Sequence, residues 1–182
     1  MHNGGDVRTS PGVPASAKWK SAPPNDESGP ASLADGGVKG SEKQSANAKT
    51  TFETIADKAN GVIFCGSMIR MADITDGTSN TYLLGEKYVN PDYYASGEDP
   101  GDNAAALVGD NQNVARWTLL PPREDKAGHS APWQFGSAHP AGCQMAFCDG
   151  SVQLVHFSID PAVNHNLGNR KDHKPIPADA LQ

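Results

Sequence analysis

The stretch that specifies the fold most clearly is residues 143–157, which read CQMAFCDGSVQLVHF. Two apolar segments flank Asp149-Gly150, a dipeptide typical of the two-residue type I′ turn. Such a turn places Cys148 opposite Ser151 and carries that register along both strands. One face of the predicted hairpin then holds four apolar side chains, which are Met145, Phe147, Val152 and Leu154.

Short elements are expected around this hairpin. Asp160-Pro161 begins a helix that Gly168 ends, with proline at the first helical position and glycine after the last. Apolar residues at helical spacing predict another short helix over 52–59. Brief strands are expected at 62–65, 68–72, 81–89 and 114–120. The sequence therefore predicts an α+β fold: a small antiparallel sheet with a C-terminal β-hairpin, few short helices and long loops.

The composition narrows the class of protein. A length of 182 residues suits one domain with its own core, and 19 glycines and 14 prolines indicate many turns. The net charge of -6 argues against a nucleic-acid partner, because phosphate binding depends on clustered basic residues. The sequence shows neither an apolar run of the roughly 18 residues that span a membrane nor a signal-peptide core. The chain as written is therefore expected to be soluble.

Residues 1–50 differ from the rest of the chain. They contain no Ile, Phe, Tyr or Cys and are rich in Gly, Pro, Ser and Asn, which is typical of a low-complexity arm. We place the boundary near Thr50 and expect a single globular domain over 51–182.

The three cysteines are Cys65, Cys143 and Cys148, and none of them forms a Cys-x-x-Cys pair. The pattern favours buried thiols that pack as small hydrophobic groups. One bridge, between Cys65 and Cys143, is the alternative for an exported protein.

Several motifs follow one another in a fixed order through residues 60–177. Nine residues separate His139 from Asp149-Gly150. The accompanying segments are ADITDGTSNT (72–81), GEK (85–87), DPGDN (99–103), FGSAHP (135–140), SIDP (158–161) and LGNR (167–170). In these motifs the chain resembles the bacterial prepilin-type processing-associated His-nine-Asp-Gly domain, within the domain-of-unknown-function 1559 family.

The resemblance implies a fold like the head of a type II secretion pseudopilin or a type IV pilin. Such a head is periplasmic or extracellular and contains an antiparallel sheet. Members of this class begin with a cleaved leader and a hydrophobic helix, which this sequence does not show, so we expect it to correspond to the head. The implied partners are secretion or pilus components, or further copies of the chain.

The named motif supplies the first candidate site. As a functional pair, His139 and Asp149 would be catalytic or linked to a metal. In the structural interpretation, which we favour, Asp149 precedes a glycine because the turn requires it, and His139 bonds to loop backbone.

The polar segment 90–112 supplies the second candidate site. Asp99, Asp102, Asn103 and Asp110 concentrate hard oxygen ligands on one loop, and Ca²⁺ prefers such ligands. The resemblance to pseudopilin heads, which bind Ca²⁺, adds to the expectation of a calcium ion. A solvated acidic loop is the alternative.

A further carboxylate set consists of Asp73, Asp76 and Glu86. A buried carboxylate requires a partner, so Glu86 is expected to pair with Lys87 or Arg70.

Four aromatic residues could line a groove for a small ligand or a glycan, and otherwise serve as anchors that pack loops. They are Tyr93, Tyr94, Trp117 and Trp133.

Three classes of function follow from these observations. The first is a non-catalytic pilin- or pseudopilin-like head, stabilised by calcium and linked to secretion or surface assembly. The alternative is a calcium-dependent hydrolase of small esters or lactones, in which the ion polarises water or a carbonyl and His139 acts as base. The third is an adhesive or glycan-binding surface module.

Overall fold

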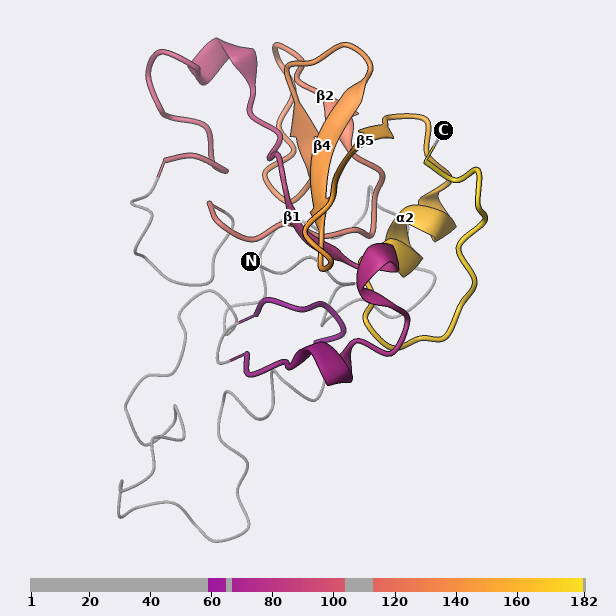
Figure 1. Ribbon diagram of the computed structural model, residues 1–182. Coiled ribbons are helices and arrows are strands. Elements are labelled where there is room, and N and C mark those ends of the chain that lie inside the picture. The colour runs from indigo at the N-terminus through magenta and orange to yellow at the C-terminus, as the bar shows by residue number, and fades with distance from the viewer. Residues whose placement is uncertain (1–58, 65–66, 104–112, 182) are drawn as a thin grey trace, which may run out of the picture.

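Figure 1 shows the computed structural model of the chain, which describes residues 59–64, 67–103 and 113–181. Its centre is an antiparallel sheet of three strands in the order β1-β4-β5. The strands are β1 (Tyr82–Gly85), β4 (Gly142–Phe147) and β5 (Val152–His156). Within the described residues, one α-helix, short 3-10 turns and long loops accompany the sheet, and this arrangement confirms the predicted α+β class.

Smaller elements complete the described part of the chain. Strands β2 (Arg123–Glu124) and β3 (Gly136–Ser137) form a parallel pair, and helix α2 (Pro161–Leu167) follows β5. The 3-10 turns are η1 (Met71–Asp73), η2 (Thr78–Asn80) and η3 (Pro91–Tyr93). Within the described ranges, no helix is long and apolar enough to cross a membrane.

The C-terminal hairpin forms, but its predicted register is wrong by one residue. Phe147 pairs with Ser151: its N–H donates to the Ser151 carbonyl at 2.8 Å, and its own carbonyl accepts from Gly150 at 3.0 Å. The loop therefore has three residues, 148–150, and Gly150 takes the left-handed conformation with φ of 89°. An Asp-Gly pair suits this three-residue loop with its bulge as well as the two-residue turn.

The shifted register changes which β5 side chains face the core. Met145 lies opposite Gln153, and Cys143 lies opposite Val155. Val155 is therefore fully buried, whereas Val152 is 62% exposed. The predicted placement of Val152 and Leu154 on the core face is wrong, because a slip of one residue turns each side chain to the opposite face.

The core lies on the Phe147 side of the sheet. It is formed by side chains from the sheet, from the loops and from α2, which are Tyr82, Phe135, Cys143, Met145, Phe147, Val155, Ile159 and Leu167. Cys143 is a buried free thiol, and burial raises its pKa to about 12. Cys143 therefore matches the prediction of thiols that pack as hydrophobic groups, while Cys65 lies outside the described residues.

Helix α2 begins and ends as predicted. The Asp160 carboxylate accepts from the backbone N–H groups of Ala162 and Val163, which have no carbonyl partner inside the helix. Gly168 closes the last turn. Figure 1 shows α2 beside the β1-β4-β5 sheet, where Leu167 joins the core.

Three other predicted strands are wrong. Segment 68–72 is loop that runs into η1, and its Met68 and Met71 are 89% and 62% exposed, so this apolar run covers no core. Residues 62–64 form no strand. In 114–120, the backbone makes one isolated bridge, from Trp117. The expected strand at 81–89 is present only over Tyr82–Gly85, as β1. The expected arm 1–50 and all of helix 52–59 except Ala59 lie outside the described residues.

Candidate functional site

The two residues of the named motif lie apart. His139 precedes β4 and Asp149 follows it, so a strand of six residues, on the order of 17 Å long, separates them. The Asp149 carboxylate accepts from the Ser151 backbone N–H at 2.8 Å and from its hydroxyl at 2.7 Å. These bonds lower the pKa of Asp149 and close the hairpin loop.

His139 lies at the opposite end of the strand from this loop. Its ring Nε2 is 3.5 Å from Glu86 Oε1, and its side chain is 62% exposed. The backbone N–H of His139 donates to the Ser137 hydroxyl, which itself donates to the Gly142 carbonyl. The structure thus brings His139 to Glu86 rather than to Asp149.

Asp99 in the acidic loop accepts hydrogen bonds from the loop backbone. It is 1% exposed, and its two carboxylate oxygens accept from the N–H groups of Asn90 at 2.8 Å and Gly101 at 2.6 Å. Nearby, the buried Arg116 guanidinium donates to the carbonyls of Ala115 and Gly101. Burial lowers the pKa of Arg116 to about 10, against the opposing effect of Asp99 and Asp102.

The other predicted calcium ligands are dispersed or outside the described chain. Asp102 forms an ion pair with Lys87, Asn103 is exposed, and Asp110 lies outside the described residues. Among the residues that the structure describes, no group of three or more His, Cys, Asp or Glu side chains could hold a metal ion. Calcium binding by the full loop stays a prediction.

The second carboxylate set is also divided among separate structural roles. Glu86 accepts from the backbone N–H of Gln144 at 2.7 Å, and the ion pair expected with Lys87 or Arg70 is not what the structure shows. Lys87 bonds to Asp102, as described above, and Arg70 pairs with Asp73 at 3.0 Å.

Asp76 connects distant parts of the chain. Its carboxylate accepts from the N–H groups of Asp172 and His173, and its own N–H donates to the Arg170 carbonyl. The Arg170 guanidinium in turn donates to the carbonyls of Ala59 and Gly61. Segments 59–61, 75–76 and 170–173 are thus tied together by polar groups of the motifs at 72–81 and 167–170.

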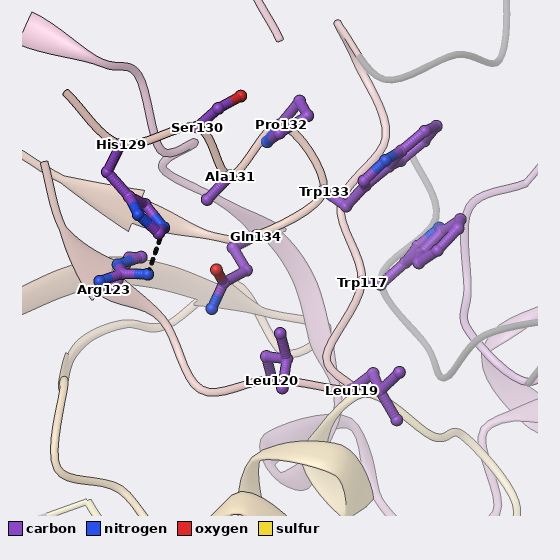
Figure 2. Close-up of a pocket in the computed structure, with 10 residues that line it drawn as sticks. All are labelled: Trp117, Leu119, Leu120, Arg123, His129, Ser130, Ala131, Pro132, Trp133 and Gln134. Atoms are coloured by element: carbon purple, nitrogen blue, oxygen red, sulfur yellow. Dashed lines mark hydrogen bonds between the residues drawn. The ribbon is translucent and has the colours of Figure 1, made fainter. Parts of the chain in front are cut away.

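A cavity of about 430 Å³ lies between the loops that flank β2 and β3. Two predicted aromatic residues form one wall, because the Trp117 and Trp133 rings stack with centroids 4.6 Å apart. The complete lining is Trp117, Leu119, Leu120, Arg123, His129, Ser130, Ala131, Pro132, Trp133 and Gln134. Figure 2 shows the indole pair at one end and Arg123 with His129 at the other.

The polar end of the cavity is a neutral histidine bound to a cation. Arg123 Nη1 lies 2.5 Å from His129 Nε2, and since a guanidinium only donates, this nitrogen accepts. Burial, followed by the positive charges of Arg123 and Lys126, lowers the pKa of His129. The imidazole is therefore uncharged at neutral pH and leaves Arg123 as the cationic group of the cavity.

Contacts behind the cavity hold this end in place. The Tyr88 hydroxyl lies 2.9 Å from the carbonyl oxygens of both Lys126 and His129 and shares its one hydrogen between them. The Asp125 carboxylate accepts from the Val89 N–H and from the Tyr94 hydroxyl. Tyr94, predicted as a groove residue, is thus an anchor of the loop and not part of the cavity lining.

Helix α2 and strand β3 hold the backbone of two lining segments, at Leu120 and at Arg123. The Asn164 side chain on α2 donates to the carbonyls of Thr118 and Leu120 at 2.9 and 3.0 Å. Strand β2 pairs with β3, where Gly136 lies opposite Arg123. A Cβ atom at Gly136 would lie 2.3 Å from the Arg123 carbonyl, so this position requires glycine.

The sequence predicts the tryptophans of the cavity as groove residues but does not predict its polar residues. Arg123 lies on β2 and His129 and Gln134 lie in the segment between β2 and β3, and nothing in their spacing matches a known motif. The available signal is the segment 117–133 itself, which places an arginine and a histidine between two tryptophans. An apolar cavity with a few converging polar groups is the usual form of a small-molecule site.

The fold and the cavity together define a small α+β domain that carries a ligand-sized hollow beside a three-stranded sheet. The chain belongs to the family described as "Protein of unknown function (DUF1559)", whose model matches residues 11–162. This match confirms the family indicated by the sequence motifs. Neither the curated proteins nor the solved structures include a match to the chain.

Proposed function

We propose that this chain is a non-catalytic pilin- or pseudopilin-like head that serves secretion or surface assembly by binding other subunits. Its α+β fold with an antiparallel sheet is compatible with such a head. The likeness of its motifs to the prepilin-type domain supports the same function. The partners would be secretion or pilus components, or further copies of the chain.

One observation supports the non-catalytic part of the proposal: the carboxylates of the motifs accept hydrogen bonds from backbone N–H groups. Asp149 closes the hairpin loop, Asp99 binds two loop N–H groups and Asp76 secures the C-terminal segment. Asp160 caps α2 in the same way. Carboxylates with these roles specify loop geometry, which a rigid binding surface requires.

Cross-linking in the bacterial cell envelope tests the assembly function. The tagged chain is expected to cross-link to pilin-type or secretion subunits, or to a second copy. Arg70→Gln, at a side chain that is 80% exposed, should preserve these products. Gly142→Ala should abolish them, because its Cβ would lie 2.2 Å from the Val155 carbonyl and disrupt the sheet. A folded chain that yields none of these products would contradict the proposal.

A further inference from the structure

The cavity contains a half-buried positive charge that the described chain does not neutralise. Arg123 bonds through Nη1 to the neutral His129, and its buried Nε has no hydrogen-bond partner among the described residues. The ion pairs among the described residues all involve other cations. A buried charge is favourable only with a partner, so this end of the cavity is suited to an anionic group.

The remainder of the cavity favours a ring with a polar edge. Trp133 provides flat apolar surface, which the buried Trp117 ring stacked on it holds in place, and Leu119 and Leu120 extend it. Gln134 lies between the indole pair and the Arg123 end (Figure 2). Its Nε2 donates to the Pro121 carbonyl at 3.0 Å, which orients the amide and leaves its oxygen as an acceptor for a hydroxyl group.

We propose that this cavity binds the carboxylated sugar ring of a uronic acid. The carboxylate would accept hydrogen bonds from Arg123, whose planar guanidinium suits such a group. The C–H face of the pyranose would lie against the indole wall, and a ring hydroxyl would donate to Gln134. A volume of about 430 Å³ is within the range of small-molecule sites, about 300–1,000 Å³.

This site goes beyond the proposed assembly function, since a head could assemble whether or not it binds a sugar. A uronate site would direct the head to acidic polysaccharide. Its failure and the failure of assembly are separate results, because ligand binding and subunit cross-linking are measured independently.

Calorimetric titration of the purified chain tests the proposal with three probes. D-glucuronate is expected to bind at least tenfold more tightly than D-glucose, which has the same ring without the carboxylate. Benzoate supplies a carboxylate on an aromatic ring, and it is expected to bind more weakly than glucuronate. Equal affinities for glucuronate and glucose, no glucuronate binding, or tighter binding of benzoate would each overturn the uronate assignment.

A matched pair of variants locates the binding. Arg123→Gln should weaken glucuronate binding at least tenfold, whereas Arg70→Gln, the same change at an exposed arginine, should leave it unchanged. Thermal melts establish that both variants fold. If Arg123→Gln does not fold, NMR titration of the wild-type chain decides: glucuronate must shift the indole N–H signals of Trp117 and Trp133. Their failure to shift would refute the site.

Discussion

The hairpin register can be tested by one pair of substitutions on the same strand. Val155 and Val152 both lie on β5, but Val155 is fully buried and Val152 is 62% exposed. Val155→Ala removes two methyl groups from the core. At about 0.8 kcal/mol per methylene-sized group plus a cavity term, we expect a loss of about 2–3 kcal/mol in the free energy of unfolding. Val152→Ala should cost below about 1 kcal/mol.

Urea denaturation followed by circular dichroism measures both values, with equal m-values required for a valid comparison. The two-residue turn would reverse the order, because it places Val152 in the core and Val155 on the opposite face. A larger loss for Val152→Ala than for Val155→Ala would therefore refute the register described here. Phe147→Ala serves as a positive control, since Phe147 is fully buried and should cost about 3–5 kcal/mol in either register.

Three further predictions concern the cavity and the acidic loop. Gly136→Ala should lower the melting temperature, because its Cβ would meet the Arg123 carbonyl at 2.3 Å; an unchanged melt would contradict this packing. In the folded chain the pKa of His129 lies below its ordinary value of 6.5, so the unfolded chain binds a proton at this residue more readily. The free energy of unfolding should therefore be unaffected by His129 protonation above about pH 6.5 and should decrease as the pH falls below that value. Denaturation between pH 7 and pH 4 should show a smaller decline for His129→Gln than for the wild type, and identical pH profiles would argue against it. If the acidic loop binds Ca²⁺, millimolar Ca²⁺ should raise the melting temperature above that in EDTA, and Mg²⁺ should not; equal melts in all three conditions would count against a calcium-stabilised fold.

The features that the sequence predicts correctly depend on local chemistry. Asp160, Pro161 and Gly168 determine the ends of α2 through capping and backbone preferences. Asp149-Gly150 identifies the hairpin for the same reason. Its register could not be settled in this way, because the same dipeptide suits loops of two and three residues. The choice depends on which β5 residues pack against α2 and the loops, which is a tertiary property.

In the cavity too, the residues with a recognisable local chemistry are predicted correctly, and the residues placed by tertiary contacts are not. Tryptophans are recognisable as ligand-wall candidates from their size and shape, and Trp117 and Trp133 do meet. The role of Arg123 could not be foreseen, because it depends on a long-range pairing with Gly136 and on the position of His129. In the acidic loop, the residue type alone does not identify the structural role. Asp99 has the chemistry of a calcium ligand, but in the structure both of its carboxylate oxygens accept hydrogen bonds from backbone N–H groups.

We propose that the motif residues maintain a binding head and perform no chemistry. The most direct test is the hydrolysis of a panel of small esters and lactones by the purified chain, with and without EDTA, alongside His139→Ala. We predict rates equal to those of protein-free buffer in every case. Turnover above that background that is abolished both by chelator and by His139→Ala, in a variant with an unchanged melting temperature, would contradict the claim and establish a metal-dependent hydrolase.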